Sequence, residues 1–221
     1  MDIRNIDMQK EKEKKFIGLF LLILSLTSCL FVVSQIITST MNYESKRAHI
    51  LSYFTIQSNI LIIVWMMALT LFILTNKKTY RFSMNINLAS AFTTYISVTG
   101  LVYWAILVPI FYAPGVTWLF SPSNIWMHTF SPVISLILLN YVKSYKDDKK
   151  IKPRLALFFI YPVLYIIFAV ANAVNGIYLY PMFNPDYLSG WIGVAGCMLA
   201  MAAIFTGLYL VLLYGLKRKN S

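Results

Sequence analysis

Residues 16–38 read FIGLFLLILSLTSCLFVVSQIIT, a run that contains no Asp, Glu, Lys or Arg. A helix of about 20 apolar residues is long enough to cross the ~30 Å hydrocarbon core of a bilayer. Lys10, Lys12, Lys14 and Lys15 stand just before the run, a position that is typical of headgroup anchors. The run is too long for the core of a signal peptide, and no small-residue cleavage pattern follows it. We therefore expect a membrane-spanning helix here.

Five further stretches are similarly long and equally free of charged residues. They are residues 51–74, 88–112, 125–142, 155–174 and 190–214. Apolar residues make up 59% of the chain and charged residues 12%, a composition that excludes a water-soluble globular domain of this size. The sequence therefore predicts an all-α polytopic membrane bundle of six transmembrane helices. It covers residues 16–214, between a basic segment at 1–15 and a basic tail at 215–221.

The basic residues alternate along the chain. Of the 19 Lys and Arg residues, 17 lie before the first stretch, in the second and fourth connections, or in the tail. Basic residues resist translocation, so both termini should be cytoplasmic, and connections 39–50, 113–124 and 175–189 should face outward. The net charge of +11 is thus placed for contact with membrane lipids, and we expect no nucleic-acid partner. The high content of Lys, Ile, Asn and Tyr suggests an AT-rich bacterial genome, so we expect the protein in a bacterial plasma membrane.

Metal and cofactor motifs are absent from the sequence. Its two cysteines, Cys29 and Cys197, lie inside predicted spans and are interpreted as small apolar packing residues. The chain has no Cys/His cluster with metal-ligand spacing and no glycine-rich phosphate loop. We therefore expect no metal and no cofactor.

Small residues recur on two of the predicted spans. They are Ser90, Thr94, Ser97 and Gly100 on the third span, and Gly193, Gly196, Ala200, Ala203 and Gly207 on the last. Small side chains let the backbones of membrane helices approach closely. We predict that both faces are helix contacts.

A polar face begins the second span, which enters from the outer side. Ser52, Thr55 and Asn59 recur at helical spacing within an apolar sequence and should share one face. Thr55 would lie roughly 6–8 Å deep, at 1.5 Å per residue.

The fourth span also enters from the outer side and carries a second polar face. Ser121 and Pro122 predict a helix start, with serine as the cap and proline in the first turn. The face consists of Asn124, His128, Ser131 and Ser135. His128 falls at the same expected depth as Thr55, but the sequence leaves open whether the two faces meet.

Pro132 adds a local feature to this second face. It has no amide hydrogen for the carbonyl four residues earlier, so we predict a kink and a free carbonyl at His128. Asn172 and Asn175 end the fifth span at the same outer level.

These polar residues suggest a hydroxyl nucleophile with a histidine base. The Thr55 hydroxyl needs a neighbouring base to accept its proton, and His128 is suited to that exchange near neutral pH. The spans contain no acid, so the imidazole would be oriented by an amide such as Asn59 or Asn124, by a backbone carbonyl, or by a loop acid. The candidate loop acids are Asp186 and Glu44, and the candidate oxyanion donors are Ser58, Asn172, Asn175 and tyrosine hydroxyls.

Two other interpretations fit the same polar faces. They could line the substrate path of a small transporter or channel. They could also be ordinary helix contacts in a non-catalytic membrane scaffold, because Ser and Thr in membrane helices commonly bond the backbone.

Three short motifs resemble the androgen-induced protein family of six-span membrane hydrolases and its bacterial relatives. The first is Phe54-Thr55-Ile56 within the stretch 53–59, and the second is Met127-His128-Thr129 followed by Pro132. The third is Tyr180-Pro181-Met182-Phe183 before the last span. The resemblance implies a threonine hydrolase that cleaves fatty acid esters of hydroxy fatty acids, with Thr55 as nucleophile and His128 as base. We therefore expect a lipid ester as substrate.

Overall fold

The computed structural model describes residues 3–41, 49–114, 116–144 and 151–215, and within these ranges it contains helices and no strand. Six helices are long and apolar enough to cross a membrane. They are Glu11–Thr40, Phe54–Thr75, Ile86–Phe111, Pro122–Ser144, Leu155–Val174 and Trp191–Tyr214. The predicted all-α six-helix membrane bundle is thus confirmed, and the chain is a multi-pass membrane protein.

Four of the six spans are single helices, and two contain a π-helical turn. The single helices are α1 (Ile3–Met41), α2 (Phe54–Thr75), α7 (Leu155–Val174) and α8 (Trp191–Tyr214). The third span joins α3 (Ile86–Val102), the π turn η3 (Tyr103–Leu107) and α4 (Val108–Phe111). The fourth joins α5 (Pro122–Ile125), the π turn η5 (Trp126–Phe130) and α6 (Ser131–Ser144). Short 3₁₀ turns connect the spans: η1 (Ile50–Ser52), η2 (Lys78–Met84), η4 (Trp118–Phe120), η6 (Pro181–Phe183) and η7 (Pro185–Tyr187).

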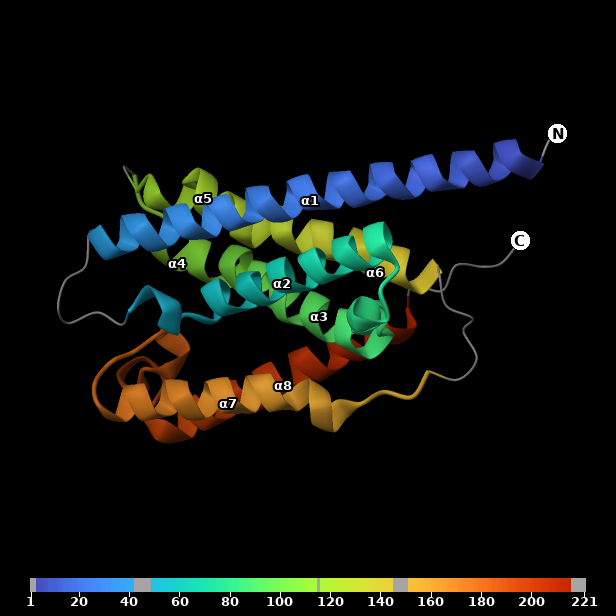
Figure 1. Ribbon diagram of the computed structural model, residues 1–221. Coiled ribbons are helices and arrows are strands. Elements are labelled where there is room, and N and C mark those ends of the chain that lie inside the picture. The colour runs from blue at the N-terminus through green and yellow to red at the C-terminus, as the bar shows by residue number, and fades with distance from the viewer. Residues whose placement is uncertain (1–2, 42–48, 115, 145–150, 216–221) are drawn as a thin grey trace.

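The helices run back and forth between two ends of the bundle. Figure 1 shows α1 beginning and α8 ending at one end, where α2 also leads through η2 into α3. This end carries Lys77, Lys78 and Arg81, and we call it the basic end. The opposite end, called the outer end, holds the start of α2, the α4–α5 connection and the α7–α8 connection. Residues 216–221 of the predicted tail, and Glu44, lie outside the described residues.

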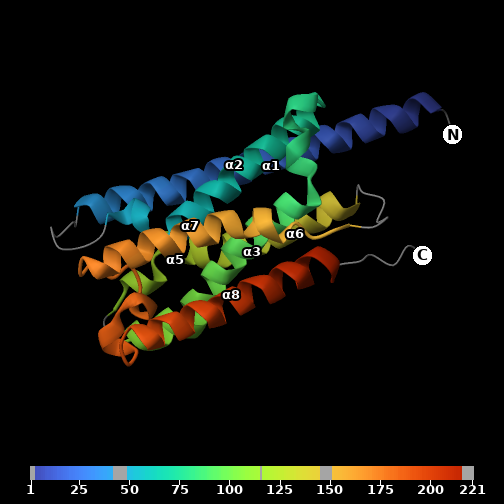
Figure 2. The same ribbon diagram turned by 90° about the horizontal axis from the view of Figure 1, so that it is seen from below.

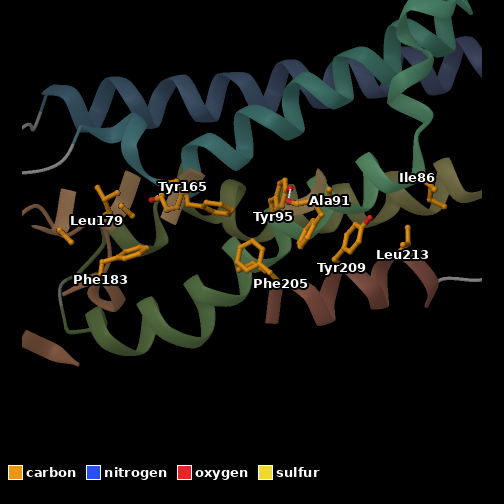
Figure 3. Packing of buried hydrophobic residues seen from close by; sticks show 14 residues of the cluster. Ile86, Ala91, Tyr95, Tyr165, Leu179, Phe183, Phe205, Tyr209 and Leu213 are labelled. Atoms are coloured by element: carbon orange, nitrogen blue, oxygen red, sulfur yellow. Dashed lines mark hydrogen bonds between the residues drawn. The ribbon is translucent and has the colours of Figure 1, made fainter. Parts of the chain in front are cut away.

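The third span lies at the centre of the bundle. α3 packs against α2, α6, α7 and α8, whereas α1 lies along the other side of α2 and contacts α5. Figure 3 shows an aromatic layer beside α3, in which Tyr165, Tyr95, Phe205 and Tyr209 follow one another. Figure 2, seen from below, shows the ribbons of α7 and α8 apart from each other.

A proline in α7 explains one bond of this layer. Pro162 lies inside the helix and has no N–H for the carbonyl of Phe158. In a membrane such a carbonyl needs another donor, because hydrocarbon offers none. The Tyr95 hydroxyl donates to the Phe158 carbonyl at 2.5 Å, so α3 supplies the missing bond to α7.

Gly100 of α3 lies at a close helix contact, whereas Gly196 and Gly207 of α8 do not. A Cβ added at Gly100 would lie 2.7 Å from the His128 carbonyl oxygen and 3.1 Å from Pro132 Cγ. The prediction of a close approach is therefore confirmed at this position. It is wrong for much of α8, because Gly196 and Gly207 have nothing within 4 Å of an added Cβ.

Gly100→Ala should destabilise the protein by about 1–3 kcal/mol, because a methyl group at this position overlaps the His128 backbone. Gly196→Ala is the matched control and should be neutral or stabilising, since alanine is the better helix former and the site is open. Thermal unfolding of both variants in detergent measures the difference. Equal midpoints for the two variants would show that α3 and η5 can move apart at no cost.

Candidate functional site

Two tyrosine hydroxyls from distant parts of the chain bind the start of α2. The first N–H groups of a helix have no partner within it, and the side chain of the N-cap residue Tyr53 does not cap them. The Phe54 N–H donates to the Tyr165 hydroxyl at 3.1 Å, and the Thr55 N–H donates to the Tyr180 hydroxyl at 3.3 Å. Helix α7 and the segment before η6 therefore hold the first turn of α2 in place.

Helix α2 begins later than the sequence pattern suggested. Its first residue is Phe54, and Ser52 belongs to the preceding turn η1. Ser52 and Thr55 thus do not share a helix face, because the chain is extended at Tyr53 between them. The Ser52 carbonyl accepts a bond from the Tyr165 hydroxyl at 3.1 Å, which is a structural contact.

Thr55 is buried, with 9% of its surface exposed, and its hydroxyl has a defined partner. Thr55 Oγ1 lies 3.3 Å from the Tyr180 hydroxyl, and either group can be the donor. The ring of Tyr53 packs edge-on against Tyr180, with centroids 5.7 Å apart and planes at 90°. Burial raises the pKa of the Tyr180 hydroxyl, against the opposing effect of its bonds with Thr55. Tyr180 therefore keeps its proton at neutral pH.

His128 lies in the π turn of the fourth span, just before Pro132. Its ring stacks on the ring of Tyr103 from the other π turn, with centroids 3.9 Å apart and planes within 8°. The side chain is 6% exposed, the Thr99 backbone bonds its imidazole, and Nδ1 has no hydrogen-bond partner among the residues that the structure describes. An aromatic stack and one backbone bond therefore fix the plane of the imidazole.

The predicted helix start in this span is confirmed. The Ser121 side chain caps α5 by accepting from the Asn124 N–H at 3.3 Å, and Pro122 is the first helical residue. The π turn follows directly and adds a residue to the helix before Pro132. π turns are rare and are frequently found at functional sites.

Hydrogen bonds connect the first turn of α2 to the other two polar segments. The Asn59 amide donates to the Thr55 carbonyl at 2.8 Å and reaches the Met127 carbonyl at 3.5 Å. The Ser58 hydroxyl donates to the Thr55 carbonyl at 3.1 Å and lies 3.1 Å from Thr99 Oγ1. Ser58 and Asn59 thus hold Thr55 beside the residues that precede His128 and beside the Thr99 turn of α3.

A cavity of about 930 Å³ opens at the outer end, and both Thr55 and His128 line it. We call it the mouth cavity. Its wall also includes Tyr103, Asn124 and Tyr180, and it extends to the end of α1. No hydrogen bond joins Thr55 to His128 in the part of the chain that the structure describes, where the Thr55 hydroxyl pairs with Tyr180 instead. Thr55 of the first predicted polar face and Asn124 and His128 of the second therefore line one cavity.

A second cavity of about 130 Å³ lies between α7 and α8, with α3 behind it. We call it the apolar cavity, because aliphatic and aromatic side chains make up most of its wall. Thr55, Tyr180 and Leu107 line both cavities. The Thr55 hydroxyl thus stands at the boundary between a polar and an apolar space.

The other predicted site residues lie at varied distances from this boundary. Asn124 lines the mouth cavity, and its amide donates to the Trp118 carbonyl at 2.8 Å. Ser131 is buried and does not line the cavity, and its hydroxyl has no partner within the described part of the chain. Asn172 and Asn175 line neither cavity, and their amides bond the carbonyls of the preceding helical turn. Asp186 is exposed in η7.

Two tyrosines in the site were not predicted individually. Tyr103 stacks on His128, and Tyr165 caps Phe54. Both belong to long apolar spans other than those of Thr55 and His128, so the sequence does not indicate that they lie beside these residues.

Comparisons with known proteins identify no relative: no family model, curated protein or solved structure matches this chain. Among the residues that the structure describes, no three His, Cys, Asp or Glu side chains gather in one place as metal ligands.

Proposed function

We propose that the chain is an integral membrane hydrolase of a bacterial plasma membrane, and that it cleaves a fatty acyl ester of a membrane lipid. Thr55 is the nucleophile and His128 the general base. The observation that carries the proposal is that both residues line the mouth cavity, at the end opposite the basic residues. The motif resemblance to the androgen-induced protein family supports the same pair of residues. The reaction needs no cofactor.

The reaction proceeds through an acyl-threonine. His128 takes the proton of Thr55 Oγ1 while this oxygen attacks the ester carbonyl carbon. The C–O bond to the alcohol breaks, and the imidazolium returns the proton to the departing alkoxide. Water from the mouth cavity then attacks the acyl group and gives a proton to His128. The fatty acid leaves, and the proton returns to Thr55.

The start of α2 can stabilise the negative charge that develops on the carbonyl oxygen. The positive end of the helix dipole lies there, together with the Thr55 N–H. The Tyr180 hydroxyl is bonded to both the N–H and the hydroxyl of Thr55, so it is close enough to donate to the substrate oxygen. Because burial raises its pKa, this phenol is present as a donor at neutral pH. One such donor is worth about 10²–10³-fold in rate.

The transfer to His128 requires the Thr55 hydroxyl to change its hydrogen-bond partner. The Thr55 hydroxyl now pairs with Tyr180. A substrate carbonyl that accepts from Tyr180 releases this hydroxyl to face His128 across the cavity. Catalytic hydrogen bonds are often long in unliganded enzymes and tighten when the substrate binds.

An alkyl fluorophosphonate tests the assignment directly. Thr55 Oγ1 attacks the phosphorus, fluoride leaves, His128 takes the proton, and a stable phosphoryl adduct remains. Mass spectrometry of the purified protein should place this adduct on the peptide that contains Thr55. An adduct on another residue only, or no adduct together with substrate flux in liposomes, would contradict the proposal and favour the transporter interpretation.

A further inference from the structure

We infer that the apolar cavity binds the alkyl chain of the ester, with the chain's carbonyl end at Thr55. The inference rests on the proposed function for the position of the carbonyl. The cavity lies between the membrane-spanning helices α7 and α8, where Figure 3 shows Tyr165 and Phe205 of its wall. Met198, Met201 and Ala202 form its α8 side. Thr55 and Tyr180 line it and also line the mouth cavity, so a chain that fills it can present its first carbons to the nucleophile.

The bonding state of the wall favours a hydrocarbon over a polar ligand. The Tyr165 hydroxyl is bonded to the Phe54 N–H and the Ser52 carbonyl. The Thr99 hydroxyl donates to the Tyr95 carbonyl at 2.9 Å. A polar ligand therefore meets other side-chain hydroxyls of the wall only at Thr55 and Tyr180, and burying its remaining polar groups would be costly.

The size of the cavity limits what it can enclose. An apolar protein cavity of about 150 Å³ stays dry and accepts a benzene-sized ligand, so about 130 Å³ encloses roughly six carbon atoms. The wall follows α7 from Phe159 to Ile166, which is about 10 Å at 1.5 Å per residue. This elongated shape fits an unbranched chain.

The cavity also has an open side toward the lipid. Val163 lines it and is 46% exposed on the outer face of α7. Met198 and Met201 of α8 are only half-buried. A longer acyl chain can therefore extend between α7 and α8 into the bilayer, while the alcohol portion and water occupy the mouth cavity.

Ala202→Phe should narrow the apolar cavity, because Ala202 is half-buried and lines it. Burial of each methylene group of the substrate raises its affinity roughly fourfold. A side chain that keeps several methylene groups out of the cavity should therefore lower the affinity by a measurable factor. We expect kcat/KM for p-nitrophenyl octanoate to fall at least tenfold, and the value for p-nitrophenyl acetate to stay within threefold. The matched control is Ala203→Phe, because Ala203 is exposed on the same helix and lines neither cavity; it should leave both values unchanged.

A binding measurement separates this inference from the proposed function. Octanoate with a terminal diazirine is crosslinked to the protein carrying Thr55→Val, with and without Ala202→Phe. Crosslinks on α7 and α8 that Ala202→Phe removes would support the binding of the alkyl chain in the apolar cavity. If such crosslinks form but no ester is hydrolysed, only the proposed function fails. If esters are hydrolysed but Ala202→Phe changes acetate and octanoate turnover equally, or changes neither, the chain site is wrong.

Discussion

Thr55→Val should lower turnover of p-nitrophenyl octanoate by at least about 10³-fold and abolish the fluorophosphonate adduct. Valine keeps the shape of threonine and removes only the oxygen that forms the acyl intermediate. The loss of the Tyr180 contact costs little more, since that hydroxyl still accepts from the residue's backbone N–H. Thr55→Ser retains a hydroxyl and should retain the adduct.

The control for this experiment lies on the same helix. Thr70 is buried in α2, and in the described ranges its hydroxyl has no hydrogen-bond partner. Thr70→Val therefore removes a buried threonine hydroxyl far from both cavities and should leave turnover within threefold. Thr55→Val turnover equal to that of Thr70→Val would exclude a threonine nucleophile at position 55.

His128→Gln should lower the same turnover by about 10²–10⁴-fold, the range for loss of a general base. Glutamine keeps a polar planar group beside Tyr103 and cannot exchange a proton near neutral pH. The pH–rate profile distinguishes a chemical role from a structural one. The wild type should lose activity at acid pH as its base becomes protonated, and the residual activity of the variant should lack that ionisation.

His49→Gln provides the comparison for the second histidine, which also lines the mouth cavity. Its Nδ1 accepts the Leu51 N–H at 3.2 Å at the start of η1, a local bond that glutamine can replace. We expect turnover within threefold and an unchanged acid limb. If His128→Gln kept the wild-type acid limb, the ionisation would belong to another group and His128 would be a packing residue.

The sequence predicted the fold better than it predicted the site. Charge-free runs of 18 to 25 residues indicate membrane helices whatever their packing, so all six spans were found. The Ser121 cap and Pro122 were found because capping is local. Helix α2 was started too early, because its first turn is capped by Tyr165 and Tyr180 rather than by a residue nearby.

The site depends on features that have no local signal. The spacing of Asn124, His128, Ser131 and Ser135 was read as α-helical, whereas the structure contains a π turn at Trp126–Phe130. The Tyr103–His128 stack joins two spans, so it depends on how those spans rotate against each other. The small residues of α8 predicted a close helix contact, but Gly196 and Gly207 have open space around them. A small side chain therefore permits a close contact between helices but does not require one.

The tyrosine caps of α2 also determine when the site can form during biosynthesis. Thr55 is translated early, but the two tyrosines that bond its helical turn come much later in the chain. Tyr165 follows its partner Phe54 by 111 positions, and Tyr180 follows Thr55 by 125. A nascent chain that has released only its first four spans from the translocon therefore holds Thr55 with neither phenol in place. Assembly of the reactive turn has to wait until the fifth span and the segment after it have been inserted.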